Sequence, residues 1–284
     1  MLVGDGRNGK GKTIDLIRRF IGIDNCSSVP LSALEENSFR ISELFGKMVN
    51  LAGDLSNTAL KETGMLKQTT GRDLIGAKRK FLPDIKFINY SKHIFACNQL
   101  PKVYDMSEGF WSRWVVFEFP NTFIAKSEYD KLDEIGRKGK KILDPRHIEK
   151  ISSKEELSGL LNKALEGLDR IFKNKEFSYS KGSSEIKKFW VRKSDSFIAF
   201  CLDNLEESND GLIPKAELRK CYHNYCKKHK LKGTSDKAIA ITLQELFGVM
   251  DIRKYHEGTT TFYWEGIQFR ISSKYKFKGG FIND

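Results

Sequence analysis

A short glycine-rich segment near the start of the chain has the composition and spacing of a phosphate-binding loop. Residues 6–13 read Gly-Arg-Asn-Gly-Lys-Gly-Lys-Thr and fit the pattern G-x-x-x-x-G-K-[ST]. Glycines let backbone N–H groups close around phosphate oxygens, and the dipole of a following helix favours their negative charge. A lysine in this pattern neutralises the outer phosphates. The segment therefore predicts a site for the phosphates of a nucleotide.

The same glycines offer a second register that begins two residues earlier. Gly4 stands at the required spacing before Gly9, and Lys10 then takes the place of the lysine. In this register the first glycine comes directly after the apolar pair Leu2-Val3, where a strand should end. Strand position thus favours Lys10 as the phosphate lysine, whereas the pattern alone favours Lys12.

The two registers also differ in the hydroxyl group that they offer to Mg²⁺. Thr13 follows Lys12 and supplies that hydroxyl, but Gly11 follows Lys10 and supplies none. The sequence leaves both registers open. We expect the nucleotide contacts to come from Gly4, Gly6, Asn8, Gly9, Lys10, Gly11, Lys12 and Thr13.

The composition is that of a folded protein with an excess of positive charge. The chain has 284 residues, 39% of them hydrophobic and 30% charged, and a net charge of +12. Such an excess favours a polyanionic partner, because each neutralised phosphate releases counterions, although a solvated basic surface has the same composition. No apolar run approaches the ~20 residues that span a bilayer, so no membrane partner is expected. Five scattered cysteines are typical of reduced thiols inside a cell.

The loop requires a strand before it and a helix after it, and the apolar pattern predicts both. Ile14, Ile17 and Ile21 recur on one helical face after the loop. The strand before it has only two or three residues where about five are usual, which is typical of the tail of a longer protein. Buried-type strands are expected at 48–52, 93–97 and 114–119, with helices at 32–43 and 59–67. This alternation predicts a three-layer α/β domain.

The remainder of the chain predicts a charged connection, a long helix and a small domain. Residues 125–144 are charged and are expected to be an irregular, exposed connection. A helix is expected at 153–172, where Ser153 and Glu156 have capping-box spacing. The apolar stripe of this helix is expected to be core and consists of Leu157, Leu160, Leu161 and Leu165. Helices at 194–205, 214–229 and 235–246, followed by strands at 250–255 and 260–269, predict a winged helix.

Further motifs follow the glycine-rich loop in a fixed order. Residues 48–55 read Met-Val-Asn-Leu-Ala-Gly-Asp-Leu, and residues 67–73 read Lys-Gln-Thr-Thr-Gly-Arg-Asp and lead on to Lys80. Residues 94–101 read Ile-Phe-Ala-Cys-Asn-Gln-Leu-Pro, and residues 110–114 read Phe-Trp-Ser-Arg-Trp. With the loop at 4–11, this set resembles the superfamily 3 helicase domain of phage and plasmid primases, the group that includes the poxvirus primase-helicase. The resemblance covers roughly the first 125 residues closely and the remainder more loosely.

The resemblance implies the fold and the activity. It implies an α/β, AAA+-type P-loop ATPase core at 1–124, N-terminally truncated, a basic connection and helical linker at 125–190, and a winged-helix DNA-binding domain at 191–284. The implied activity is ATP-dependent DNA unwinding in the replication of a phage, plasmid or other mobile element, inside the cell. ATP and Mg²⁺ are the implied cofactors. The implied partners are single-stranded DNA, further copies of the chain in a hexameric ring, and a primase domain or protein.

The resemblance also implies roles for individual residues. Asp54 would hold Mg²⁺ with Thr13 and orient the attacking water, and Asn98 would hold that water near the γ-phosphate. Arg113 would act as an arginine finger on the nucleotide of a neighbouring subunit. From the residues alone, Asp54 and Asn98 have the alternative interpretation of turn residues, and Arg113 that of a surface cation at a helix end.

Three adjacent cations, Lys78, Arg79 and Lys80, would follow the DNA backbone from a loop in the channel of the ring. Without the motif they would be read as a solvated face. A zinc site is not expected at Cys221, His223, Cys226 and His229, because these residues fall on different helix faces; Cys221 is expected in the core and the others in solvent. His93 is expected to be structural. Two rivals remain open: a catalytically inactive, DNA-binding remnant, and a small-molecule P-loop kinase.

Overall fold

The chain folds into two units of mixed α/β structure. The computed structural model describes residues 1–36, 38–53, 55, 59–179, 181–229, 231, 233–256, 259–271 and 273. The first unit is Met1–Phe189 and the second is Trp190–Asp284. None of the helices in these described ranges has the length and apolarity that a bilayer crossing requires.

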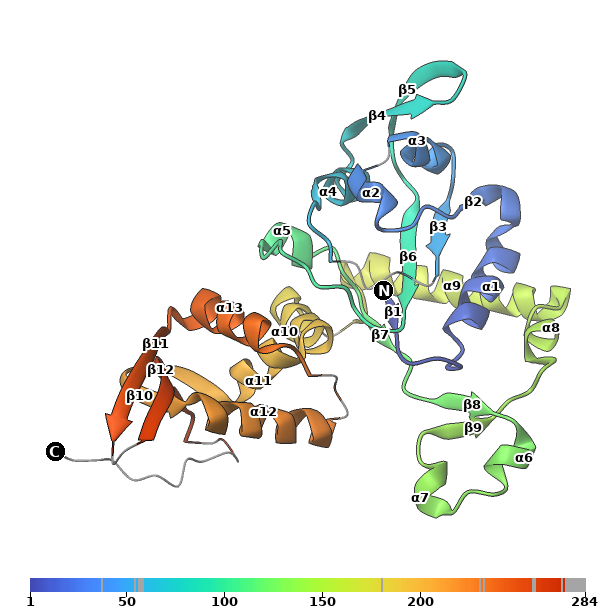
Figure 1. Cartoon of the computed structure of the whole chain (residues 1–284). Coiled ribbons are helices and arrows are strands. Elements are labelled where there is room, and N and C mark those ends of the chain that lie inside the picture. The colour runs from blue at the N-terminus through green and yellow to red at the C-terminus, as the bar shows by residue number, and fades with distance from the viewer. Residues whose placement is uncertain are drawn as a thin grey trace. The chain divides into compact units, whose positions relative to one another are not determined.

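A five-stranded sheet forms the centre of the first unit (Figure 1). Its order is β2 (Cys26–Ser27), β3 (Val49–Ala52), β6 (Lys92–Cys97), β1 (Leu2–Val3) and β7 (Phe117–Glu118). All four pairings are parallel. Every residue of β1 and β3 is buried, as the apolar runs predicted, because a parallel sheet is covered on both faces. The expected strand at 114–119 is shorter than predicted, since only Phe117 and Glu118 pair with β1.

Helix α1 (Lys10–Ile21) packs its apolar face on this sheet. Ile14 is buried against Leu51 of β3 and Ala96 of β6, with Ile17 and Ile21 beside it. The helix ends at Gly22, whose N–H donates to Arg18 O at 3.0 Å and whose φ of 87° suits glycine. Packing on the sheet thus fixes the direction in which the N-terminus of α1 points.

A buried amide joins the two central strands of the sheet. The Asn50 side chain is fully buried; its Oδ1 accepts from Val29 N at 2.7 Å, and its Nδ2 donates to Val29 O at 2.8 Å. With the amide oriented in this way, Nδ2 donates to His93 Nδ1 at 3.2 Å, so the imidazole proton lies on Nε2. Burial, together with Lys92, lowers the pKa of His93 to about 4. His93 is therefore a neutral group that is bonded to Asn50 inside the unit, and its structural role stays a prediction.

Short helices and a hairpin lie beyond the sheet. The 3₁₀ turn η1 (Ile23–Asn25) precedes β2. Within the range 32–43, where a helix was expected, lie α2 (Ala33–Glu36), α3 (Ser38–Ile41) and the start of the 3₁₀ turn η2 (Ser42–Leu44). Helix α4 (Gly64–Gly71) begins five residues later than predicted, because Leu60 instead pairs with Val103. It leads into β4 (Leu74–Arg79) and β5 (Leu82–Ile88), an antiparallel hairpin that projects beyond α3 (Figure 1). Helix α5 (Glu108–Trp111) precedes β7.

The segment expected to be an irregular connection is instead ordered. Strands β8 (Thr122–Ile124) and β9 (Lys140–Ile142) pair in parallel, with α6 (Lys126–Tyr129) and α7 (Glu134–Arg137) between them. Phe123 N donates to Arg7 O at 2.7 Å, which joins this lobe to the glycine-rich loop. The sequence did not reveal this pairing, because each strand contributes only three residues and the segment around them is highly charged.

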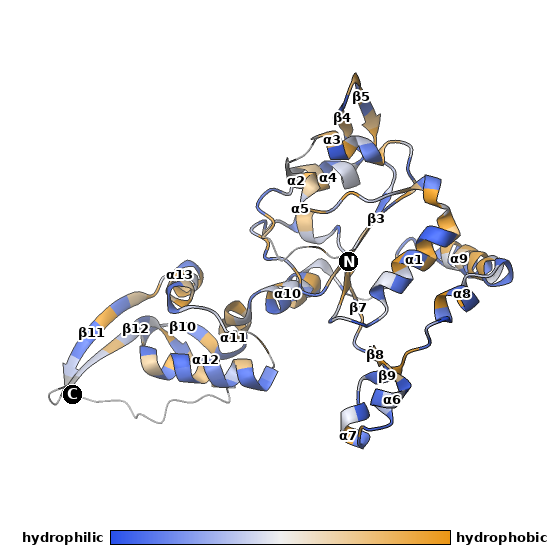
Figure 2. Cartoon of the chain, turned by 45° about the vertical axis from the view of Figure 1, so that its right-hand side comes forward, coloured by the Kyte–Doolittle hydropathy of each residue, from blue (hydrophilic) through white to orange (hydrophobic). Residues whose placement is uncertain are grey.

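Helices α8 (His147–Ile151) and α9 (Lys154–Asn174) follow the lobe. The N-cap is as predicted: Ser153 Oγ accepts from Glu156 N at 3.3 Å. The assignment of the leucine stripe to the core is wrong, since no residue of α9 is buried and Leu161 and Leu165 are exposed. Figure 2 shows that hydrophobic and hydrophilic residues both occur along α9. Helical periodicity identifies an apolar face but not what covers it.

The described residues of the second unit form the end of one helix, three further helices and a three-stranded sheet. Helix α10 (Ser183–Ser194) runs across the boundary between the units, and α11 (Ser196–Asn204), α12 (Lys215–His229) and α13 (Asp236–Phe247) follow. They enclose a core with an antiparallel sheet of β10 (Leu205–Pro214), β12 (Thr259–Phe269) and β11 (Met250–His256). The predicted helices and strands of this region are confirmed to within two residues at most ends. Cys226 is buried along with Cys221, which corrects the expectation that only Cys221 lies in the core.

The buried imidazole of His93 predicts a pH-dependent stability. Because its folded pKa of about 4 lies below the ordinary 6.5, the unfolded state binds a proton first, and stability falls as the pH drops from about 7 to 4. His93→Asn should abolish up to about 3 kcal/mol of this loss, measured by urea unfolding at each pH. His147→Asn, at an exposed histidine of α8, should keep the wild-type pH dependence. Identical curves for wild type and His93→Asn would refute the assignment.

Candidate functional site

The glycine-rich loop occupies residues 4–9, between the end of β1 and the start of α1. Gly9 is the N-cap of α1, in the left-handed region at φ 95°. The strands β1, β3 and β6 run in parallel, so their carboxyl ends meet at the edge where the loop lies. Ligands of open α/β sheets bind outside this edge, where strand connections diverge. The chain leaves β1 for the β2 side and later crosses to β7 on the other side, so the loop stands at such a point.

Gly4 makes a close approach that only glycine allows. A Cβ at this position would lie 2.4 Å from Asn8 Nδ2 and 2.5 Å from the carbonyl oxygen of Phe119. Asn8, buried in the loop, donates from Nδ2 to the same Phe119 oxygen at 3.2 Å. At Gly6 and Gly11, by contrast, a Cβ would meet nothing within 4 Å. The first glycine of the Lys10 register is therefore the one that the packing requires.

Lys10 lies at the centre of the loop and is 6% exposed. Its ammonium donates to Gly4 O at 2.5 Å, Asp5 O at 3.0 Å and Asn8 Oδ1 at 3.0 Å. It also reaches Asn98 Oδ1, at 3.2 Å, just beyond the end of β6. The geometry thus brings together three of the residues singled out in the sequence, Asn8, Lys10 and Asn98. A buried ammonium at the mouth of a glycine-rich loop is a group with which an anion entering the loop can form charge-assisted hydrogen bonds.

The second lysine and the threonine are not among the groups that contact the Lys10 ammonium in the described hydrogen bonds. Lys12 is exposed on the first turn of α1. Thr13 Oγ1 donates to Gly9 O at 3.1 Å, a bond within the helix. The hydroxyl of the Lys12 register is therefore not directed into the loop beside Lys10.

A hollow of about 380 Å³ adjoins the loop. Asn8, Gly9, Lys12 and Thr13 line one side of it, and Phe119 and Phe123 line another. Both aromatic rings come from the chain that passes β7 and enters β8. The hollow has the polar and aromatic lining that suits a flat, partly apolar ligand group next to a phosphate.

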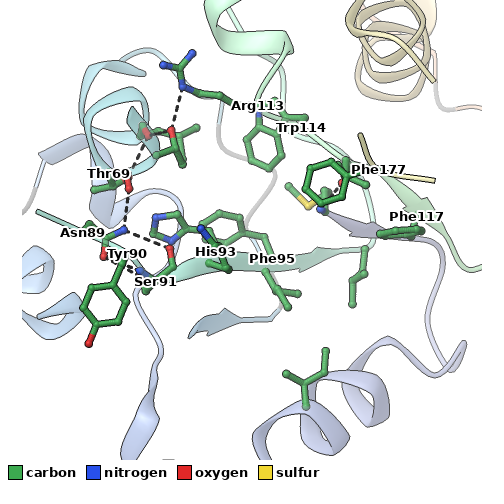
Figure 3. Close-up of a pocket in the computed structure, with 18 of the residues that line it drawn as sticks. Thr69, Asn89, Tyr90, Ser91, His93, Phe95, Arg113, Trp114, Phe117 and Phe177 are labelled. Atoms are coloured by element: carbon green, nitrogen blue, oxygen red, sulfur yellow. Dashed lines mark hydrogen bonds between the residues drawn. The ribbon is translucent and has the colours of Figure 1, made fainter. Parts of the chain in front are cut away.

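The two remaining predicted catalytic residues are Asp54 and Arg113. Asp54 falls outside the described residues. Arg113 follows α5 and donates from Nε to Thr70 Oγ1 at 3.0 Å and from Nη1 to Gly109 O (Figure 3). Within the described part of the chain, no hydrogen bond or ion pair joins Arg113 to the loop.

Arg113 instead borders a larger cavity of about 1150 Å³ next to β6. Figure 3 shows Trp114, His93 and Phe95 among its labelled lining residues. The Trp114 ring lies 6.1 Å from that of Phe95 and 5.8 Å from that of Phe110. These rings anchor the segment that carries Arg113 on the sheet.

The three predicted DNA-contacting cations lie at the end of the β4–β5 hairpin. Lys78 and Arg79 are in β4 and Lys80 is in the turn, with Lys78 and Lys80 exposed. The sequence reading missed Phe81, which is 91% exposed at the turn, with its ring 5.1 Å from Lys80 Nζ. The signal that could have revealed the hairpin is the two-residue spacing of the apolar Ile75 and Ala77, which is typical of a strand. Both residues are buried, as is Phe87 on the partner strand.

Comparisons with known proteins agree with a likeness to helicases over part of the chain. Residues 2–113 match a family model described as a family of unknown function, DUF5906. A protein of Acanthamoeba polyphaga mimivirus, named "putative helicase", is 28% identical over 138 residues. That match covers 46% of this chain and spans 14% of the length of the mimivirus protein.

Solved structures of the C-terminal region of NrS-1, in its apo form, are also similar to this chain. One shares 14% sequence identity, has a TM-score of 0.35, and is matched over 93% of this chain and 65% of that one. Another shares 16% identity with a TM-score of 0.40 at the same coverage.

The close approach at Gly4 predicts contrasting effects of two alanine substitutions. Gly4→Ala should destabilise the first unit by about 1–3 kcal/mol, because backbone atoms must shift to admit the methyl group. Gly6→Ala, where a Cβ meets nothing, should change stability by less than about 0.5 kcal/mol. Urea unfolding of both variants measures the difference. Equal stabilities would contradict the loop geometry.

Proposed function

We propose that this chain is the motor part of an ATP-dependent DNA helicase of the superfamily 3 type, which acts in the replication of a mobile element. The observation that carries the proposal is the buried Lys10 ammonium at the carboxyl edge of a parallel sheet, 3.2 Å from Asn98. In this proposal the glycine-rich loop is a P-loop in the Lys10 register. The similarity to a protein named as a helicase supports the same conclusion.

ATP fits the loop in its size, charge and surroundings. Lys10 would exchange its bonds to Gly4 O and Asp5 O for bonds to phosphate oxygens, which are stronger because both partners are charged. The N-terminus of α1 would direct its free N–H groups to the same phosphates. The nucleoside would occupy the hollow beside Phe123. Bound ATP supplies the phosphoanhydride bond that is hydrolysed.

Mg²⁺ fits the described residues less fully. The residue after Lys10 is Gly11, which has no hydroxyl, and the Thr13 hydroxyl is bonded to Gly9 O. The protein ligand that we propose for Mg²⁺ is therefore Asp54, with the remaining positions filled by water and phosphate oxygens. Asn98, whose Oδ1 contacts Lys10, would accept a hydrogen bond from a water near the outer phosphate.

Arg113 would complete the site of a neighbouring subunit. Since Arg113 is bonded to Thr70 and to Gly109, its role in hydrolysis requires a second copy of the chain, and we propose a ring. Single-stranded DNA would lie against the exposed Lys78, Lys80 and Phe81 of the hairpin, since cations follow the phosphates and an aromatic ring stacks on a base. The second unit would bind DNA as a winged helix, with Arg253 and Lys254 exposed on β11.

One observation favours a rival function. The lack of a hydroxyl after Lys10 would weaken Mg²⁺ binding, as expected for a DNA-binding remnant that no longer hydrolyses ATP. A small-molecule kinase, the other rival, would hydrolyse ATP without regard to DNA. ATP turnover thus separates the remnant from the other two candidates, and the response of turnover to DNA separates the kinase from the motor.

The Lys10 register predicts unequal effects of substituting the two lysines. Lys10→Ala should lower ATP turnover at least 100-fold, because it removes a charge that the transition state needs. Lys12→Ala should retain turnover within about threefold, since Lys12 is exposed and outside the loop interior. The measurement is steady-state phosphate release by each purified variant, with binding to single-stranded DNA as the control for folding. Loss of turnover in Lys12→Ala with retention in Lys10→Ala would contradict the proposal.

A further inference from the structure

One carboxylate of the first unit accepts hydrogen bonds from two separate segments. Asp105 Oδ2 lies 2.5 Å from Lys67 Nζ and also accepts from Thr63 Oγ1. Asp105 Oδ1 accepts from Ser107 N at 2.9 Å. Lys67 Nζ lies 3.3 Å from Ser107 Oγ as well. We call these four residues the Asp105 clasp.

The clasp joins the beginnings of two helices. Thr63 is the N-cap of α4, and Lys67 lies one turn into that helix. Ser107 is the N-cap of α5. Helix α5 has only four residues, which is too few to hold its orientation by internal hydrogen bonds. The contacts that hold its direction are the clasp, the packing of Phe110 on Trp111, and the hydrogen bond that Ser183 Oγ donates to Glu108 Oε1.

Arg113 joins the same two helices at their other ends by a hydrogen bond. It follows α5 directly, and its Nε donates to Thr70 in the last turn of α4. The Thr70 hydroxyl itself donates to Leu66 O at 2.7 Å, so it is oriented to accept from Arg113. A change in the angle between α4 and α5 at the clasp would therefore displace the guanidinium.

The carboxylate is strongly held in its charged form. Its side chain is only 15% exposed, and burial alone would raise the pKa of Asp105. Hydrogen bonds from Lys67, Ser107 and Thr63 outweigh burial and hold that pKa well below its usual value. The clasp is thus intact throughout the pH range in which an ATPase is assayed.

We propose that Asp105 is a positioning residue for Arg113: by fastening α5 to α4, its carboxylate sets the place from which Arg113 reaches the nucleotide of a neighbouring subunit. This inference rests on the proposed function, because it requires Arg113 to act across a subunit interface. It adds a residue outside every motif that the sequence singled out. Asp105 touches neither the nucleotide nor the loop, so its effect must pass through Arg113.

The test uses mixed rings, because a positioning residue and the residue it positions must fail together. Asp105→Asn should lower ATP turnover at least tenfold while leaving the affinity for a fluorescent ATP analogue within twofold. Mixed with Lys10→Ala subunits, which have an intact Arg113, Asp105→Asn subunits should regain turnover. Mixed with Arg113→Ala subunits they should regain none, because every finger is then defective. A defect in general stability would not produce this selective pattern.

The controls separate the inference from the proposed function. Asp144→Asn removes a carboxylate with the same type of contacts, to Lys150 Nζ at 2.6 Å and Arg146 N at 3.0 Å, and should keep wild-type turnover. Thr63→Val removes one bond of the clasp and should give a milder loss with the same mixing pattern, which covers the case in which Asp105→Asn does not fold. If Arg113→Ala is rescued by Lys10→Ala but Asp105→Asn and Thr63→Val are not, the inference is overturned alone. If Arg113→Ala is not rescued either, the intersubunit site fails and the inference falls with it.

Discussion

The first unit depends on one arrangement, a lysine ammonium buried at the carboxyl edge of a parallel sheet. Lys10 can occupy this place only because the loop turns sharply at Gly4, where any side chain would strike Asn8 and Phe119. The sheet in turn fixes α1, since Ile14 packs between β3 and β6. The sheet thus holds the loop carbonyls, the Asn98 amide and the cation close together before any ligand arrives. A site ordered in advance needs little reorganisation when an anion binds.

The same sheet links this centre to the parts that lie away from it. Asn98 directly follows the carboxyl end of β6, and the amino end of β6 follows β5 of the hairpin. Helix α4 connects the hairpin to the Asp105 clasp and holds Arg113 through Thr70. The edge of the sheet that carries the loop, the hairpin and Arg113 are thus connected by short, well-bonded segments of one unit. In a motor, such connections would let a change at the nucleotide move the hairpin.

Features that depend on local pattern were predictable from the sequence, and features that depend on distant contacts were not. The buried strands at 48–52 and 93–97 and the helices of the second unit follow from apolar runs and periodicity, and the structure confirms them. The late start of α4 could not be predicted from the local pattern, because Leu60, in the expected first turn, instead pairs with the distant Val103. The exposure of the α9 stripe did not follow either, since periodicity does not identify a partner. The sequence left the choice of lysine open, because the pattern alone favoured Lys12 and strand position favoured Lys10. The surroundings that bury Lys10 include Asn98 and, through Asn8, Phe119, which lie about 90 residues or more away in the chain.

The central claim is that ATP hydrolysis in this chain is coupled to single-stranded DNA, and the most direct test is phosphate release with and without an oligonucleotide at low salt. The account predicts that DNA stimulates hydrolysis by the wild-type protein severalfold, and that replacing Lys78, Arg79 and Lys80 with alanine removes the stimulation but not the basal rate. Hydrolysis that is indifferent to DNA would point to a small-molecule kinase. No hydrolysis in either condition, with DNA still bound, would contradict the motor and leave a DNA-binding remnant.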